Sequence, residues 1–118
     1  APSVLEDDAE IYFKTLGHKI PFMNCTVDAQ LRYSNQITSA VHIDGTSRVH
    51  TVSKQFNPKF YRLIKYFKKI TGVPVIINTS FNLKGQPIVE TPRDALMTFY
   101  GSGLDFLILG SFVVLKKN

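Results

Sequence analysis

Cysteine is nearly absent from this sequence, which contains Cys25 alone. A single cysteine cannot form an internal disulfide, so nothing marks the chain as secreted and a reducing compartment fits best. Long apolar runs are absent as well, since no segment approaches the roughly 20 residues needed to span a bilayer. The acidic start APSVLEDDAE is also unlike a signal peptide. We therefore expect a cytoplasmic chain without a membrane partner.

Common nucleotide and metal motifs are lacking too. Neither the phosphate loop G-x-x-x-x-G-K-[ST] nor the dinucleotide fingerprint G-x-G-x-x-G occurs. His18, His42 and His50 have no metal-ligand spacing with one another or with Cys25, so the sequence predicts no metal site. We interpret the histidines as surface or satisfied core residues. Cys25 has no nucleophile signature and is interpreted as a small buried apolar side chain.

The sequence does contain enough apolar material for a core. Hydrophobic residues make up 44% of its 118 positions, which predicts one folded domain over residues 1–118. Lys and Arg outnumber Asp and Glu by 14 to 9, for a formal charge of +5. This excess favours an anionic partner, which is a phosphorylated small molecule, a nucleic acid or an acidic protein surface.

Local signals in the first half of the chain predict a helix, a loop and a hairpin. Ser3 and Glu6 have the spacing of a capping box and predict a helix through about Phe13. The segment 21–35 has no clear period, so we expect a loop with one short element. In ITSAVHIDGTSRVHTV, β-branched residues lie on both sides of Asp44-Gly45, which predicts two extended segments that meet at a tight turn.

The second half begins with a basic amphipathic helix. Asn57-Pro58 has the pattern of an N-cap and first helical residue, and Gly72 marks the end. Apolar residues recur at helical spacing and are expected to face the core: Phe60, Leu63, Ile64, Phe67 and Ile70. The Lys and Arg residues between them are expected to form a solvated face.

The remaining segments predict strands and one more helix. Residues 73–77 form a continuous apolar run, typical of a strand buried on both faces. A second helix is expected from Thr91-Pro92 to Gly101, followed by β-like runs at 106–109 and 112–115. This order of elements predicts an α/β fold of α+β-like character, an open twisted sheet with helices packed against it.

Polar residues crowd the end of the strand predicted at 73–77. They are Asn78, Thr79, Ser80, Asn82 and Lys84, followed by Gly85. Ligands of open α/β sheets lie just beyond the carboxyl ends of strands. These side chains offer amides, hydroxyls and one positive charge, the groups that recognise a phosphorylated ligand. The alternative is that the Asn, Thr and Ser side chains only cap a turn by bonding to nearby backbone.

Arg48 is the second candidate for binding. It follows the predicted turn in DGTSRVH, where its planar guanidinium is suited to hold a phosphate or carboxylate through two hydrogen bonds. The alternative is an ordinary surface Arg on a strand. No residue of the chain is an obvious catalytic base, so we assign binding roles and no catalytic one.

Three segments together resemble a known family. APSVLEDDAEIYF, AVHIDGTSRVHTV and PVIINTSFNLKGQPIVETPRDAL are similar to the carboxyl-terminal region of the O-carbamoyltransferases, which include nodulation proteins and enzymes that tailor antibiotics. The similarity covers nearly the whole chain. The motif NTSFN-x-K/R-G-x-P-I-V followed by T-P-x-D-A is long enough to be specific.

The resemblance implies a fold and an activity. Family members are longer proteins that join an amino-terminal, metal-binding domain of the actin-like ATPase superfamily to a carboxyl-terminal YrdC-like domain. The YrdC-like part is understood to combine carbamoyl phosphate and ATP, with Mg²⁺, into carbamoyl-adenylate by way of a carbamate. The other domain then moves the carbamoyl group to an acceptor hydroxyl. Our sequence matches the later part of the YrdC-like domain.

The resemblance also assigns roles to residues. The arginine of the family's DGT-x-R falls on Arg48, which would bind the phosphates of ATP or the adenylate. The NTS motif falls on Asn78, Thr79 and Ser80, of which Asn78 and Ser80 would contact the nucleotide. The family carries a basic stretch upstream of APS, and this chain begins at Ala1. Because clustered phosphates need several cations, we expect the isolated chain to bind nucleotide weakly and to catalyse nothing by itself.

Two other interpretations stay open. The net charge and the basic residues near Tyr61, Tyr66 and Phe67 are compatible with a nucleic-acid-binding α/β module. The helical period argues against this interpretation, since Phe67 is expected in the core stripe and the lysines lack a stacking platform. The segment is alternatively a docking surface for the rest of its parent chain, with exposed apolar surface that promotes self-association.

Overall fold

A computed structural model describes residues 1–117 and contains both helices and short sheets, as the α/β expectation requires. The chain divides into two compact units, Ala1–Asn78 and a second that begins at Thr79, which we describe separately. The expectation of one domain over the whole chain stays a prediction. No helix in the described part is both long and apolar enough to cross a bilayer.

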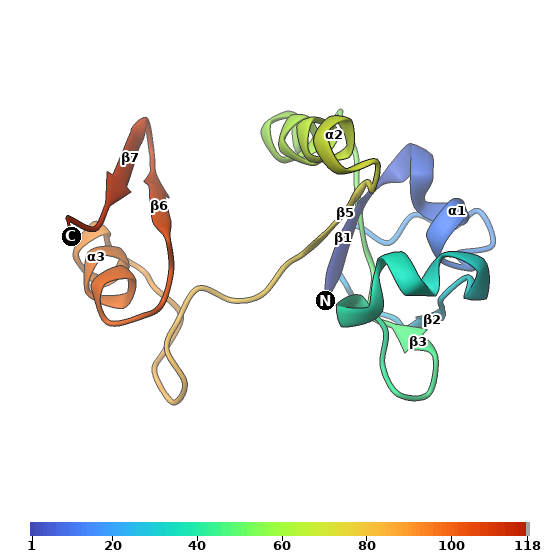
Figure 1. Cartoon of the computed structure of the whole chain (residues 1–118), viewed down its shortest axis with the longest axis horizontal. Coiled ribbons are helices and arrows are strands. Elements are labelled where there is room, and N and C mark those ends of the chain that lie inside the picture. The colour runs from blue at the N-terminus through green and yellow to red at the C-terminus, as the bar shows by residue number, and fades with distance from the viewer. Residues whose placement is uncertain (118) are drawn as a thin grey trace. The chain divides into compact units, whose positions relative to one another are not determined.

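The first unit is built on a three-stranded sheet (Figure 1). Its strands are β1 (Pro2–Leu5), β4 (His50–Val52) and β5 (Val75–Ile77), in the order β4-β1-β5. β1 runs parallel to β4 and antiparallel to β5, and Ser3 lies opposite both His50 and Ile76. All four residues of β1 are buried, as expected for a strand with neighbours on both sides.

Each face of this sheet packs against its own cluster. On one face Leu5, Val52 and Ile76 pack with Ile64 of helix α2 (Pro58–Thr71). The Ile64 side chain is fully buried. The other face contributes Val4 and Val75 to the larger cluster, whose buried members also include Ala9, Tyr12, Phe13, Ala29, Ile37, Ala40 and Val49. Side chains alternate between the two faces along β1, the period of two that strands impose.

The start of the chain corrects the first prediction. Residues 2–5 form β1, and the helical segments follow as the 3-10 turn η1 (Glu6–Asp8) and the short helix α1 (Ala9–Tyr12). Ser3 is fully buried and its Oγ lies 3.0 Å from Nδ1 of His50, so the predicted capping box is wrong. Pairing with two strands outweighs a local cap because it satisfies the backbone along the whole segment.

The predicted hairpin is half right. Gly45 has a φ of +80°, and its N–H donates to the carbonyl of His42, so the tight turn is present. The segment before the turn forms 3-10 turns η2 (Leu31–Gln36) and η3 (Thr38–Ala40). The strand after it, β3 (Thr46–Ser47), pairs with β2 (Val27–Asp28), while β4 pairs with β1. The extended segment predicted before the turn is therefore wrong.

Helix α2 confirms the predicted termini but not the predicted burial. The side chain of Asn57 accepts a hydrogen bond from the N–H of Phe60, and Gly72 ends the helix in the left-handed conformation. Leu63, Phe67 and Ile70 are exposed, so the expected core stripe is buried only in part. β5 likewise lies at an edge of the sheet, with Ile77 exposed, and is not buried on both faces.

The second unit packs a helix against a hairpin. Helix α3 (Pro92–Tyr100) starts at the predicted position, with a capping box in which Thr91 and Asp94 exchange hydrogen bonds. Strands β6 (Phe106–Leu109) and β7 (Phe112–Leu115) pair antiparallel, as predicted. One face of this hairpin packs on α3. The other face carries exposed apolar side chains, namely Phe106, Ile108, Val113 and Leu115.

Candidate functional site

The register of the sheet places two predicted binding residues at one end. Arg48 precedes β4 by two residues, and His50, the first residue of β4, lies opposite Ser3. Asn78 follows β5 directly, and Ile77 lies opposite Pro2. Both residues therefore lie at the end of the sheet where β1 begins. Two strand spacings, about 10 Å, separate β4 from β5, a span that a long Arg side chain and a polyphosphate bridge together.

Arg48 is free to bind an anion. The residue is exposed, and within residues 1–117 its guanidinium has no salt bridge and no hydrogen bond. A guanidinium without an internal partner loses no protein contact when it meets a phosphate or carboxylate. The same exposure fits an ordinary surface Arg, so its phosphate role stays a prediction.

Asn78 is anchored through its backbone. Its N–H donates to the carbonyl of Ala1 at 2.7 Å, and its own carbonyl accepts from the nitrogen of Ala1 at 3.1 Å. The half-buried side chain donates a weak hydrogen bond to Sδ of Met23 at 3.8 Å. These contacts hold the residue in place and leave the amide oxygen available as an acceptor.

The other predicted residues belong to the second unit. Thr79, Ser80 and Lys84 are exposed, which suits a binding role without establishing one. The amide of Asn82 donates to the carbonyls of Leu83 and Gln86, at 3.2 and 3.0 Å. This is the turn-capping use of an Asn side chain. The amide nitrogen of Asn82 therefore caps a turn, which is the alternative to ligand binding that the sequence left open. A ligand would have to contact the amide oxygen.

His50 is a half-buried histidine with a hydrogen-bond partner, which agrees with the interpretation of the histidines as surface or satisfied core residues. Its Nδ1 is paired with the buried hydroxyl of Ser3, and its ring stacks on Phe60 at 6.0 Å between centroids. Burial lowers the pKa of His50 below its usual value of 6.5. His50 also borders a groove of about 410 Å³ whose walls include Phe22 and Phe56. The alternation of residues in VHTV is the one signal that places His50 and Val52 on the same face.

The remaining single residues are placed as follows. His18 and His42 are exposed, as interpreted. Cys25 is exposed in a loop before β2, so the expected buried role is wrong. The loop segment has no strand or helix to turn the thiol inward.

Metal ligands do not gather in the described part of the chain. Within residues 1–117, no three His, Cys, Asp or Glu side chains lie close enough to hold a metal ion. At the Arg48 end, Asn78 offers one neutral oxygen. Mg²⁺ binds mainly to carboxylates, waters and nucleotide phosphates. These residues alone would not hold a magnesium ion, so one would have to be held by the phosphates of a nucleotide.

Comparison with known proteins decides the family. The model of a family described as carbamoyltransferase C-terminus matches residues 1–116. The chain belongs to this family. It is 41% identical over 120 residues to nodulation protein NolNO of Sinorhizobium fredii, which covers 100% of this chain and 18% of that protein. It is 31% identical over 81 residues to the 3'-hydroxymethylcephem-O-carbamoyltransferase of Amycolatopsis lactamdurans, which covers 69% of this chain and 16% of that protein.

A second nodulation protein extends the comparison. NolO of Bradyrhizobium diazoefficiens is 41% identical over 119 residues, or 99% of this chain and 22% of that protein. The chain spans about a fifth of the length of such relatives. The predicted resemblance to the carboxyl-terminal region of nodulation and antibiotic carbamoyltransferases is confirmed at the level of the family.

Proposed function

We propose that this chain is the nucleotide-binding part of an O-carbamoyltransferase. The family match supports the reaction class, and the position of Arg48 and Asn78 at one end of a sheet supports the site. The chain would form the later part of a YrdC-like domain. Its ligands would be ATP and carbamoyl phosphate, with Mg²⁺ bound to the phosphates.

The residues would act by binding and positioning. The guanidinium of Arg48 would neutralise phosphate oxygens through two parallel hydrogen bonds. Asn78 would offer an amide oxygen from a fixed position. Thr79, Ser80 and Lys84 belong to the second unit, and their contacts to the nucleotide stay a prediction from the sequence. In the proposed reaction water first hydrolyses carbamoyl phosphate to carbamate and inorganic phosphate. A carbamate oxygen then bonds to the α-phosphorus of ATP, and pyrophosphate leaves.

The transfer step is assigned to another part of the parent protein. An amino-terminal domain of the actin-like ATPase superfamily, with its own metal ion, would pass the carbamoyl group to an acceptor hydroxyl in the cytoplasm. Arg48 supplies one positive charge at this end of the sheet, whereas carbamoyl phosphate and ATP together carry several negative ones. Crowding such anions requires more cations than one. The chain alone would therefore bind ATP weakly and would not turn over carbamoyl phosphate.

An NMR titration of the chain with ATP and Mg²⁺ tests this proposal. We expect a dissociation constant in about the millimolar range and no release of phosphate from carbamoyl phosphate. Arg48→Ala should weaken binding about tenfold, because a charge-assisted bond is lost. The matched variant Arg93→Ala, at an exposed position of α3, should leave it unchanged. Tight binding with turnover, or binding indifferent to Arg48→Ala, would refute the proposal.

A further inference from the structure

Helix α2 presents a concentrated positive charge. It carries five basic residues and no acidic one. Lys68 is paired with the buried Asp8, at 2.7 Å. The other four have no salt bridge within residues 1–117 and are exposed, and we call them the basic edge of α2: Lys59, Arg62, Lys65 and Lys69. Repulsion among these cations raises the energy of the free protein, and an acidic partner would relieve it.

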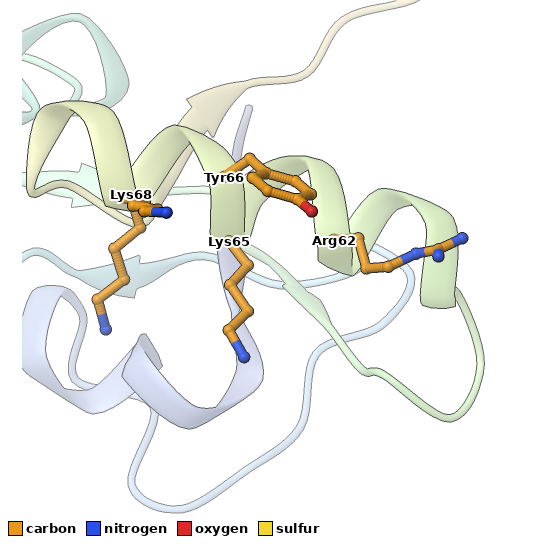
Figure 2. Close-up of a pocket in the computed structure, with 5 residues that line it drawn as sticks. Arg62, Lys65, Tyr66 and Lys68 are labelled. Carbon is orange, nitrogen blue, oxygen red and sulfur yellow. The ribbon is translucent and has the colours of Figure 1, made fainter.

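Tyr66 lies within this basic edge. Figure 2 shows its ring beside the helix between Lys65 and Arg62, while the side chains of Lys65 and Lys68 leave the helix on one side. The side chain is 66% exposed. The expectation that the basic face lacks an exposed aromatic ring is therefore wrong. The expectation was wrong because it considered the apolar stripe and the charged residues of the helix and left out Tyr66, which belongs to neither group.

An apolar strip runs beside the basic edge. Leu63, Phe67 and Ile70 are spaced by four and three residues, so they share one side of the helix. Their exposed fractions are 56%, 38% and 84%. Phe60, Tyr61 and Ile64 are the residues of α2 that pack in the cluster with the sheet. The core contacts of α2 therefore leave this apolar strip uncovered in the first unit.

We propose that this face of α2 docks an acidic, amphipathic segment of a protein. Leu63, Phe67 and Ile70 would pack against its apolar side chains, and the basic edge would meet its carboxylates. Each part of the face would then have a matching partner. Burial would remove the apolar strip from water, and the planar guanidinium of Arg62 would form two hydrogen bonds with a carboxylate. Tyr66 lies at the border of the two parts and suits a contact that is apolar on one side and polar on the other.

A nucleic acid fits the same face less well. It would satisfy the basic edge and stack a base on Tyr66. It offers no apolar counterpart to Leu63 and Ile70, since an aliphatic side chain provides no stacking surface for a base. The apolar strip therefore decides in favour of a protein partner.

The test uses a labelled synthetic peptide of about five helical turns, with leucines along one face and glutamates elsewhere. Three further probes separate the possibilities: a peptide of the same composition in scrambled order, an all-glutamate peptide of equal length, and single-stranded oligouridylate. Fluorescence anisotropy gives each dissociation constant at physiological salt. We expect the amphipathic peptide to bind about tenfold tighter than the scrambled one, which corresponds to one well-packed apolar contact set.

Two pairs of variants locate the contact. R62E/K65E/K69E should weaken amphipathic peptide binding about tenfold or more, while K54E/R93E/K117E, an equal change of charge at exposed positions, should not. L63S/I70S should also weaken it, whereas L31S/I43S, at positions that are 85% and 110% exposed, should not. Thermal unfolding of each variant verifies that the fold is kept.

The outcomes decide the proposal in either direction. It is supported when both variants of the α2 face weaken amphipathic peptide binding and both controls leave it unchanged. Equal binding of the scrambled or all-glutamate peptide shows a charge effect alone and overturns it. Oligouridylate that binds tighter than every peptide overturns it in favour of a nucleic acid. Absence of peptide binding also overturns it, as does binding that is indifferent to L63S/I70S.

Discussion

Arg48 and Asn78 lie at the same end of the β4-β1-β5 sheet, on opposite sides of the start of β1. This relationship follows from the antiparallel pairing of β5, whose carboxyl end lies beside the amino ends of β1 and β4. The fold therefore brings a free guanidinium and an anchored amide, 30 residues apart in sequence, to the same end of the sheet. We regard this end of the sheet as the centre of the proposed nucleotide site.

Ile64 is the residue through which α2 is held on the sheet, since it is fully buried between Leu5 and Val52. Ile64→Ala should lower the free energy of unfolding by about 2–5 kcal/mol, because it removes apolar contacts and leaves a cavity. Urea unfolding followed by circular dichroism measures the change. Ile70→Ala on the same helix is the control, and its 84% exposure predicts almost no effect. Equal effects of the two variants would contradict the described packing of α2.

His50 should make stability depend on pH. Burial lowers its pKa in the folded state, so below the ordinary value of about 6.5 the unfolded chain binds more protons than the folded one. The free energy of unfolding should therefore fall as the pH drops through this range, until the folded state is protonated too. Denaturant unfolding at several pH values measures this slope.

His50→Gln should flatten the slope, because the titrating group beside Ser3 and Phe60 is removed. The control His18→Gln, at an exposed position, should retain it. A slope that persists unchanged in His50→Gln would assign the dependence to other groups and contradict the buried imidazole.

Tyr61 should ionise late. Its hydroxyl donates to the carboxylate of Asp7 at 2.6 Å, and this bond raises the pKa of Tyr61 to about 12. The chain has five tyrosines. In an NMR pH titration the ring carbon signals of Tyr61 should shift only at pH values well above the usual tyrosine pKa of about 10. Asp7→Asn should return the pKa of Tyr61 toward that value, because the negative charge is removed. An unchanged titration in Asp7→Asn would show that the two side chains do not interact in solution.

The outer face of the β6-β7 hairpin should promote self-association. Phe106 lies opposite Leu115, and Ile108 lies opposite Val113, so four exposed apolar side chains form one continuous surface. Sedimentation velocity of the chain should show larger species as concentration rises, since exposed apolar patches favour association. F106T/V113T should reduce them without loss of β-propensity, whereas L31T/I43T should not. A chain that stays monomeric throughout would contradict the prediction.

Local chemistry is enough to predict some elements of this fold. The termini of α2 depend on Asn57, Pro58 and Gly72, and those of α3 on Thr91 and Asp94, all within a few residues of the backbone groups that they satisfy. Ser3 shows the limit of such signals. Its spacing to Glu6 is that of a cap, but strand pairing with residues some 50 and 70 positions away decides its structure. A local pattern contains no information about those partners.

The candidate site shows the same division. The position of the polar cluster after a strand was predictable, because an apolar run that ends in Asn78 is visible in the sequence. That Arg48 lies at the same end of the sheet depends on the register of three strands, which no local pattern contains. The partners of His50, Ser3 and Phe60, were not predictable because they come from other elements. The exposed strip on α2 was missed because periodicity identifies an apolar face without showing what covers it.

The most direct test of the shared site is a map of the residues that respond to nucleotide. An isotopically labelled chain is titrated with ATP and Mg²⁺, and backbone and side-chain amide shifts are followed by NMR. We predict that the signals of Arg48 and Asn78 move together with one dissociation constant. Signals of Arg48 and Asn78 that respond with different constants, or a response of only one of them, would contradict a common nucleotide site.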